Sequence, residues 1–246
     1  MSLIVLSNYR LKTHYAVEDN TLIIYNKSAI NPDDDHLILP VSPRDIITPR
    51  YIFFLAEKLG FTDQWFIPED FLVKYGTKEI EFYFEVSEQK AFDDYIYLTK
   101  DLIHLEGNKY AKQRNLIHQF CKKYQTTCKV EIEMIDSSNP PECVYFLHEW
   151  CALRKCDVNN GESLACEKMA TMNAPDNIDP LEVKGLPIRI NGVVCSFGIS
   201  SPLTYNMGVL NFEKARASIK GLYQFLDNEC AKHLFPAINI STRKAI

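Results

Sequence analysis

The chain has 246 residues and a formal net charge of -5, with 46% hydrophobic and 24% charged residues. This length allows one large domain or two of about 120 residues each, and the composition is typical of a globular protein. No run of about 18 apolar residues is present, which argues against a transmembrane helix, and the acidic balance argues against a protein that coats nucleic acid.

The N-terminal sequence and the cysteines bear on the cellular compartment of the protein. MSLIVLSNYR has no basic n-region and no small-residue cleavage site, so we expect a strand rather than a signal peptide. The eight cysteines all lie between Cys121 and Cys230. Without a secretory signal we expect them to be free thiols in a reducing compartment, with the cytoplasm as the default.

The first third of the chain predicts strands followed by a helix. TLIIY and HLILP are apolar runs bounded by Asn, Asp and Pro, a pattern typical of strands. SPRDIITPRYIFFLAEKLG begins with prolines and stops at Gly60, which predicts a helix with a glycine C-terminal signal. EIEFYFEV (79–86) alternates charged and apolar residues and predicts a half-buried strand.

The next segment carries the basic residues. DDYIYLTKDL predicts a short strand and a short helix that ends near Gly107. From Leu116 onward, apolar residues at spacings of three, four and seven form one face of a helix. Lys109, Lys112 and Arg114 cluster in the first turn and a half of that helix. CKVEIEMI (128–135) predicts another alternating strand.

The second half again mixes helices and strands. SNPPECVYFLHEWCALRKC (138–156) and GESLACEKMATM (161–172) predict two helices, and residues 170–185 a loop. LPIRINGVVCSFGIS predicts a hairpin that turns at Asn191-Gly192. TYNMGVLNFE predicts a strand, SIKGLYQFLDNECAKHLF an amphipathic helix and AINI a closing strand. We place a domain boundary at DSSNPP, which divides the chain into residues 1–137 and 138–246.

The basic helix start is the first candidate site. Unpaired N–H groups and the macrodipole at a helix N-terminus favour an anion, and cations there are unfavourable. Three cations in that turn therefore suggest a negatively charged ligand such as a phosphate group. The alternative is a solvated helix face with Glu106 as the ion-pair partner.

The second candidate site is the corner between the TYNMGVLNFE strand and the long helix after it. In α/β sheets, ligands bind at such strand–loop–helix corners. Glu213 at the end of the strand fits a general base for an amine nucleophile, with Lys214 beside it and Lys220-Gly221 early in the helix. The alternative is a surface ion pair between Glu213 and Lys214 or Lys220.

The sequence contains no recognisable metal-binding, nucleotide-binding or serine-hydrolase motif. Cys143, His148, Cys151 and Cys156 have no second pair at zinc spacing, so we expect no metal site. The sequence has no Walker-type loop, no G-x-S-x-G and no G-x-G-x-x-G after a strand. We therefore expect no tightly bound cofactor.

Both candidate segments resemble one family. DLIHLEGNKYAKQRNLIHQFCKKY resembles the signature of an uncharacterised family that shares the C-terminal catalytic domain of phosphatidylglycerol lysyltransferases. VLNFEKARASIKGLYQFLDNECAKHLF resembles the second block of that family, IRINGVVCSFGIS the strand pair before it, and Glu162 lies in a segment that fits an intervening helix. The resemblance covers residues from about 90 to 240. The matched positions are Leu105, Gly107, Lys109, Lys112, Arg114, Asn115 and Phe120 in the first block, and Glu213, Lys214, Gly221, Tyr223 and Gln224 in the second.

The resemblance implies a mixed α/β (α+β) fold of two tandem acyl-CoA N-acyltransferase-like units, each a twisted sheet flanked by helices. It implies transfer of an aminoacyl group from the acceptor end of a tRNA to an amine or hydroxyl on a lipid head group, a small molecule or a peptide. Acyl-CoA is the less favoured donor, because the sequence lacks a Q/R-x-x-G-x-G/A loop. Glu213 would be the catalytic residue. The residues implied to bind the phosphates of the donor or the substrate are Lys109, Lys112, Arg114, Asn115, Lys214, Lys220, Gly221 and Tyr223.

The C-terminal segment departs from the family pattern. The family has an Asn-Arg-Glu run there, whereas Asn239 is followed by Ile240 and Ser241 in this chain. Two alternatives to a transferase therefore stay open. One is a catalytically inactive binding protein that keeps the transferase fold, and the other is a structural domain whose basic helix is merely solvated.

Overall fold

The structure is a computed structural model that contains two compact units, Leu6–Lys90 and Met1–Val5 with Ala91–Ile246. The predicted strand at the N-terminus, the predicted helix over 161–172 with Glu162, and Asn239 lie outside the described residues. The residues that the structure describes are 11–29, 31–88, 94–135, 140–154, 183–235 and 240–244.

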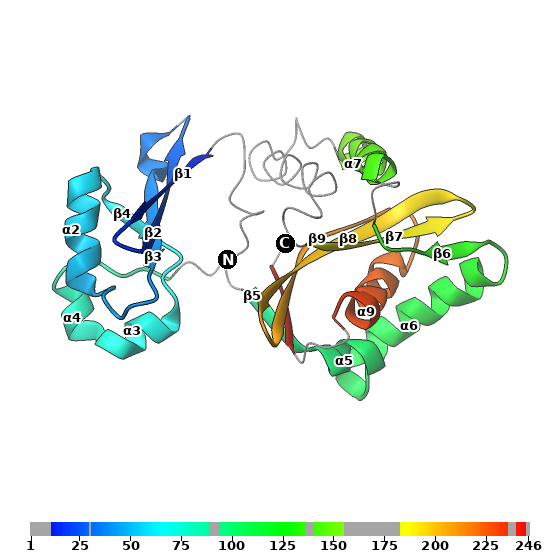
Figure 1. Ribbon diagram of the computed structural model, residues 1–246. Coiled ribbons are helices and arrows are strands. Elements are labelled where there is room, and N and C mark those ends of the chain that lie inside the picture. The colour runs from blue at the N-terminus through cyan, green and yellow to red at the C-terminus, as the bar shows by residue number, and fades with distance from the viewer. Residues whose placement is uncertain are drawn as a thin grey trace. The chain divides into compact units, whose positions relative to one another are not determined.

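In its described residues, the unit Leu6–Lys90 contains a four-stranded sheet and three α-helices (Figure 1). The strands lie in the order β1-β2-β3-β4, antiparallel except for the parallel pair of β3 and β4. Its apolar core includes Ile23, Leu37 and Leu55. The elements are β1 (Leu11–Glu18), β2 (Thr21–Ser28), β3 (His36–Val41), α2 (Pro49–Leu59), β4 (Asp63–Trp65), α3 (Glu69–Tyr75) and α4 (Thr77–Glu81).

The residues at the two ends of α2 determine where this helix begins and ends. Thr48 Oγ1 accepts a hydrogen bond from the backbone N–H of Tyr51 at 3.1 Å, and Pro49 occupies the first turn, where no N–H is needed. Gly60 ends the helix in the left-handed conformation with a φ of 77°. The two predicted strands and this helix are confirmed.

The predicted strand over residues 79–86 is wrong. Helix α4 occupies Thr77–Glu81, and the backbone N–H of Phe84 bonds to the carbonyl of Ile80 at 2.9 Å. Alternation predicts a half-buried surface, but a strand also needs a neighbouring strand with free hydrogen-bonding groups. In the described part of the chain, this segment has no such neighbour, and Phe82 is largely exposed.

The described residues of the unit that contains Ala91–Ile246 form a six-stranded sheet in the order β5-β10-β9-β8-β7-β6. β10 is parallel to β9 and antiparallel to β5. The strands are β5 (Asp94–Leu98), β6 (Val130–Ile132), β7 (Lys184–Ile190), β8 (Val193–Thr204), β9 (Met207–Ala215) and β10 (Ile240–Lys244). The helices are α5 (Thr99–His104), α6 (Ala111–Phe120), α7 (Pro140–Arg154) and α9 (Leu222–Leu234), with a 3-10 turn over Asn108–Tyr110 and a π-helical turn over Cys121–Gln125.

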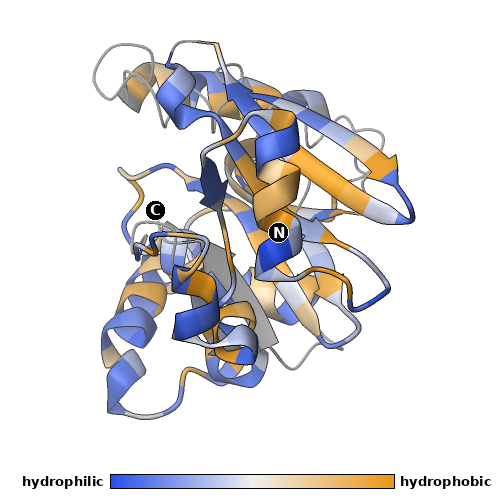
Figure 2. Ribbon diagram, turned by 90° about the vertical axis from the view of Figure 1, so that its left-hand side faces the viewer, coloured by the Kyte–Doolittle hydropathy of each residue, from blue (hydrophilic) through white to orange (hydrophobic). Residues whose placement is uncertain are grey.

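Helices cover both faces of this sheet. Helix α7 packs on one face through Phe146 and Trp150, while α6 and α9 pack on the other through Phe120 and Phe225 (Figure 1). Strands covered on both faces are expected to be apolar along most of their length. The burial of β7 and β8 is nearly continuous, as this arrangement requires. Hydrophobic stretches are visible along strands of the molecule in Figure 2.

The hairpin of β7 and β8 turns where the sequence predicts. Asn191 and Gly192 have φ values of 51° and 82°, so both central residues are left-handed, as a type I′ turn requires. Ile190 pairs directly with Val193 across the turn. The predicted hairpin is therefore confirmed.

The predicted boundary at residue 137 falls inside the unit that contains Ala91–Ile246. Strands β5 and β6 precede residue 137, yet they pair with β10 and β7, which follow it. The compact units instead divide near residue 90. Pairing between strands far apart in the sequence leaves no local sequence signal. The Pro-rich segment near residue 137 therefore could not indicate that the strands on either side of it belong to one sheet. The mixed α/β class with two sheets flanked by helices is confirmed.

Within the described ranges, no helix is both long enough and apolar enough to cross a membrane. Over the same ranges, no group of three His, Cys, Asp or Glu side chains is placed to hold a metal ion. The cysteines that the structure describes are free thiols, namely Cys121, Cys128, Cys143, Cys151, Cys195 and Cys230.

Candidate functional site

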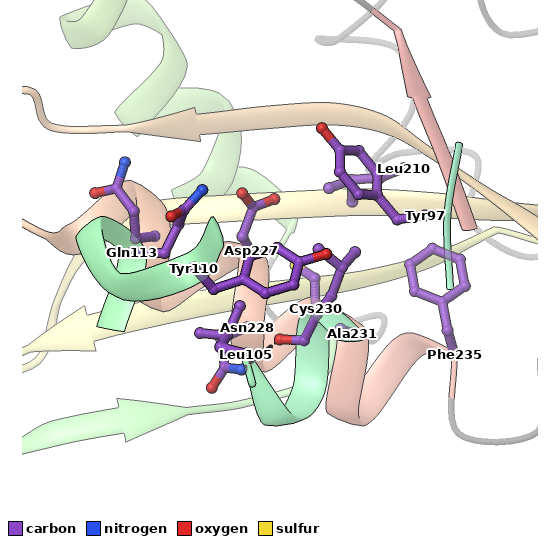
Figure 3. Close-up of a pocket in the computed structure, with 12 residues that line it drawn as sticks. Tyr97, Leu105, Tyr110, Gln113, Leu210, Asp227, Asn228, Cys230, Ala231 and Phe235 are labelled. Carbon is purple, nitrogen blue, oxygen red and sulfur yellow. Dashed lines mark hydrogen bonds between the residues drawn. The ribbon is translucent and has the colours of Figure 1, made fainter. Parts of the chain in front are cut away.

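A cavity of about 60 Å³ lies where α5, α6 and α9 meet β5 and β9 (Figure 3). This volume accommodates a few water molecules or one small chemical group. Figure 3 shows the side chains of Gln113, from α6, and Asp227, from α9, among those that surround it. The lining residues are Tyr97, Leu102, Leu105, Tyr110, Gln113, Leu210, Gln224, Asp227, Asn228, Cys230, Ala231 and Phe235.

The connection between α5 and α6 is held by two side chains. The Asn228 amide donates to the carbonyl oxygens of Leu102 and Ile103 at 2.7 and 2.9 Å. Arg114 Nη1 donates to the carbonyl oxygens of Leu105 and Gly107, the latter at 2.7 Å. These bonds satisfy carbonyl groups that the end of a short helix leaves without partners, so they fix one wall of the cavity.

The basic residues of the first block do not line this cavity. Lys109 Nζ lies 3.1 Å from Asp101 Oδ2, and this hydrogen bond raises the pKa of Lys109. Lys112 and Asn115 are exposed to solvent on α6. Lys109 is therefore a solvent-exposed residue with an ion-pair partner, as the alternative interpretation of the basic helix expects, but the partner is Asp101 rather than Glu106.

Tyr110 and Gln113 belong to the same turns as the basic residues, and they do line the cavity. Tyr110 is buried, and its ring centroid lies 4.8 Å from Lys109 Nζ. The first block thus presents neutral polar side chains to the cavity and cations to the solvent. The sequence drew attention only to the cations, because charge is the more visible signal.

Glu213 and Lys214 lie on opposite faces of the sheet. Both are buried, with exposed fractions of 7% and 3%. Lys214 Nζ lies 4.8 Å from the ring centroid of Trp150 on the α7 face, whereas the charge of Glu213 acts on Cys230 on the α9 face. Successive residues of a strand point in opposite directions. The alternative of a surface ion pair at Glu213 is therefore wrong.

A β-bulge sets the direction of Glu213. The pairing of β8 with β9 shifts between Ile199–Phe212 and Ser200–Leu210, which leaves Asn211 as the extra residue. Leu210 packs with the core on the α9 face and Phe212 with the core on the α7 face. The bulge therefore places Leu210, which lines the cavity, and Glu213 on the same face of the sheet.

Cys230 links Glu213 to the cavity. Cys230 lines the cavity, and burial, followed by the negative charge of Glu213, raises the pKa of its thiol well above the usual value. A Cβ atom added at Gly198, which pairs with Glu213 across the strands, would lie 2.6 Å from Cys230 Sγ. Glu213 and Gly198 thus lie beneath the middle of α9, next to the cavity wall.

The start of α9 packs tightly on α6. Gly221 has a φ of 84°, and a Cβ atom there would lie 2.1 Å from the carbonyl oxygen of Leu116. Only glycine combines this backbone conformation with this close approach. Lys220 is exposed, and Tyr223 is half-buried against the core between α6 and α9. The glycine of the family pattern at position 221 is therefore explained by the packing of α9 on α6.

Helix α9 supplies cavity residues that the sequence alone did not single out for a role. Gln224, Asp227, Asn228 and Ala231 follow one another at spacings of three, one and three, so they share one helix face. Three polar residues on one face, next to the apolar face of Leu222, Phe225 and Leu226, are the signal that would have identified them. Tyr97 on β5 carries no comparable signal in the sequence.

A family model described as "Phosphatidylglycerol lysyltransferase, C-terminal" matches residues 71–241, which is more than half of the chain. These residues include α6, Glu213, α9 and every residue that lines the cavity. No curated protein matches the chain.

Two solved structures share the fold. A conserved protein of unknown function from Bacteroides thetaiotaomicron is 24% identical, with a TM-score of 0.80, over 96% of this chain and 77% of that one. The C-terminal domain of a putative lysylphosphatidylglycerol synthetase from Agrobacterium fabrum is 16% identical, with a TM-score of 0.58, over 94% of this chain and 70% of that one.

Proposed function

Because the chain belongs to the family of phosphatidylglycerol lysyltransferase C-terminal domains, we propose that it is an acyltransferase that moves an aminoacyl group from aminoacyl-tRNA to an amine or hydroxyl acceptor. Acyl-CoA is the second donor. The observation that carries the proposal is the family match over residues 71–241, which spans both the basic helix and the strand of Glu213. A lipid head group is the acceptor that the family description favours, and the cytoplasm is the proposed compartment.

In the proposed reaction, the acceptor nitrogen or oxygen attacks the carbonyl carbon of the donor ester. The new bond forms to that carbon, and its bond to the tRNA 3′ oxygen breaks. Glu213 takes the proton from the acceptor and returns it to the leaving oxygen, as a general base and then a general acid. Its position supports this role, because this buried carboxylate lies on the α9 face of the sheet beside Cys230, which lines the cavity.

The donor phosphates are assigned to the exposed face of α6 and the start of α9. Lys112 and Lys220 are exposed there. Asn115 is exposed three residues after Lys112 on α6, and Tyr223 lies about one turn along α9 from Lys220. Lys109 and Arg114 contribute charge, while their hydrogen bonds hold Asp101 and the Leu105–Gly107 turn. Lys214 is left out of this set, because it is buried against Trp150 on the other face of the sheet.

The test is transfer from charged tRNA. Purified protein is incubated with tRNA that carries radioactive amino acids, and the label released from tRNA and recovered in lipid or amine products is counted. Parallel reactions contain acyl-CoA, with release of the thiol as the readout. Transfer of label from tRNA supports aminoacyl-tRNA as the preferred donor, and thiol release without tRNA turnover makes acyl-CoA the donor instead.

Glu213→Gln tests the assigned base. We expect activity to fall by about 10²- to 10⁴-fold, the usual contribution of general acid–base catalysis. The matched control is Glu229→Gln, because Glu229 is an equally buried glutamate of α9 that pairs with Lys232 and His233. We expect this control to retain activity if it folds, and an equal loss in both folded variants would remove Glu213 from the mechanism.

The second candidate function is a binding protein without catalysis. It is favoured by the hydrogen bonds of Lys109 and Arg114, which already engage two of the three cations of the basic turn. We expect Arg114→Gln to lower stability by about 1–3 kcal/mol, because two carbonyl groups lose a charged donor. Lys112→Gln removes the same charge without a described contact, so it should leave stability unchanged and weaken donor binding. A folded protein that binds charged tRNA but turns over neither donor supports the second candidate.

A further inference from the structure

A second cavity lies within the unit Leu6–Lys90, at the first turns of α2 and the β1–β2 turn. Its volume is about 830 Å³, inside the range of ligand-binding pockets. It is open to solvent on one side, and all of its lining residues fall between Glu18 and Lys58. The family match begins at residue 71, so family membership assigns nothing to this cavity.

Thr21 is the first indication of a ligand. This residue begins β2, lines the cavity and has an exposed fraction of only 1%. Its Oγ1 has no hydrogen-bond partner among the described residues. Buried hydroxyl groups in folded proteins are nearly always hydrogen-bonded, so one that lines a cavity without a partner indicates a missing polar partner there.

The N-terminus of α2 is the second indication. Thr48 and Arg50, from the start of this 11-residue helix, both line the cavity. Its first turn contains no acidic residue, and Thr48 Oγ1 satisfies the N–H of Tyr51. A helix N-terminus attracts anions through its dipole, and in α2 the dipole is the main contribution, because Pro49 has no N–H and the N–H groups of Tyr51 and Ile52 bond to Thr48. The guanidinium of Arg50 lies over the ring of Phe54, with Cζ 5.6 Å from the ring centroid, and this contact holds its positive charge at the cavity.

The charges around the cavity favour an anion. Arg44, Arg50 and Lys58 face Glu18 and Asp19, which leaves one net positive charge. Lys58 Nζ pairs with Glu18 at 3.1 Å, so this carboxylate is already neutralised. Arg44 donates to the backbone carbonyl of Asp19, a bond that holds its guanidinium at the cavity.

We propose that this cavity binds the phosphate group of a phosphate ester. Arg44 and Arg50 supply planar donor pairs that suit phosphate oxygens, Thr21 supplies a hydroxyl, and α2 supplies its N-terminus. Tyr51 and Phe54 also line the cavity and provide an apolar surface for the organic part of the ester. A soluble phosphate ester and a lipid head group share this chemistry. The proposal does not depend on the transferase activity.

The test measures binding to the full chain at constant ionic strength. Inorganic phosphate and glycerol 3-phosphate are titrated by calorimetry, with citrate as the carboxylate comparison. We expect both phosphates to bind, and Arg50→Gln and Arg44→Gln each to weaken binding by about tenfold, since each removes a charged donor. The matched control is Lys78→Gln on α4, which removes one exposed positive charge outside the cavity and should change nothing.

Thr21→Val separates a ligand contact from a packing defect. The valine keeps the shape of the side chain and removes the hydroxyl without a partner, so the unliganded protein should be at least as stable. We expect the affinity for inorganic phosphate to fall several-fold in the same variant. Unchanged affinity in Thr21→Val would remove the hydroxyl from the site and overturn this assignment.

The source of the phosphate is resolved with vesicles. Vesicles of phosphatidylcholine with and without phosphatidylglycerol are sedimented with the protein. Binding that needs phosphatidylglycerol and is lost in Arg50→Gln identifies a lipid head group, whereas binding of glycerol 3-phosphate alone identifies a soluble ester. The proposal is overturned if no phosphate probe binds, if citrate binds as well as phosphate, or if Arg50→Gln binds as the unmodified chain does.

Discussion

At the scale of single residues, burial decides which side chains can act. Glu213 and Lys214 are neighbours in the sequence, yet one faces α9 and the other packs against Trp150 on the α7 face. Gln224 and Asp227 carry no unusual charge pattern, but both line the cavity. A residue's type indicates which chemistry it can perform, and only its surroundings indicate whether a substrate can reach it.

His36 illustrates how surroundings set a protonation state. Its ring is 1% exposed and stacks on Trp65 with 4.0 Å between ring centroids. Nδ1 lies 2.7 Å from the carbonyl oxygen of Asp34, and Nε2 lies 3.0 Å from the amide nitrogen of Asn26. Nδ1 therefore donates and Nε2 accepts, so the neutral ring satisfies both bonds. Burial lowers the pKa of His36 below its usual 6.5.

This shift predicts acid sensitivity. The pKa of His36 is lower in the folded chain than in the unfolded chain, so the unfolded chain binds the proton more readily. The stabilisation is complete above pH 6.5 and is lost as the pH falls through the folded pKa. We expect the free energy of unfolding, followed in urea by the fluorescence of Trp65 in a Trp150→Phe background, to decrease as the pH falls below 6.5. His36→Gln cannot be protonated and should lose most of this dependence. An identical pH profile for both proteins would contradict the prediction.

At the scale of elements, local signals predicted most helices and the hairpin. Thr48, Gly60 and Asn191-Gly192 act through their own backbone conformations, which depend little on distant parts of the chain. The strand predicted over residues 79–86 is wrong, because alternation of charged and apolar residues indicates a half-buried surface but does not indicate whether a neighbouring strand is available for pairing. The connection of α5 to α6 depends on Asn228, more than one hundred residues away, and so could not be predicted locally.

The contact of α9 with α6 predicts a large effect at Gly221. Gly221→Ala introduces a Cβ atom 2.1 Å from the carbonyl oxygen of Leu116, in addition to the strain of a φ of 84°. The matched control is Gly60→Ala, since Gly60 is also left-handed, with a φ of 77°, and has open space around it. We expect the control to lose about 1–2 kcal/mol of unfolding free energy from strain alone. Gly221→Ala should lose about 1–3 kcal/mol more, the usual cost of overpacking. Unfolding free energies are measured in urea. Equal losses in the two variants would show that α6 and α9 can move apart to accommodate the new Cβ atom without a loss of stability.

At the scale of the whole molecule, the two units have separate apolar cores. The core of Leu6–Lys90 is a small cluster around Leu37, whereas the unit with Ala91–Ile246 has larger clusters on both faces of its sheet. Stabilisation by burial grows with the apolar area removed from water. The smaller unit is therefore expected to be the less stable one.

The two tryptophans allow this to be measured, because Trp65 belongs to the smaller unit and Trp150 to the larger. Trp150→Phe leaves fluorescence from the smaller unit, and Trp65→Phe leaves fluorescence from the larger one. In urea we expect the Trp65 signal to change at a lower concentration than the Trp150 signal. Circular dichroism of the unmodified chain should then show both transitions. A single shared midpoint for the two probes would indicate that the units unfold as one.

The sequence by itself determined the helices with their caps, the hairpin, the mixed α/β class and the family, because these depend on short segments whose residues act locally. Only the tertiary structure decided that β5 and β6 complete the sheet of the C-terminal half, that Glu213 and Lys214 lie on opposite faces, and which neutral side chains surround the cavity. These features arise from pairing and packing between residues far apart in the chain. Their energies depend on geometry in space, which no short segment encodes.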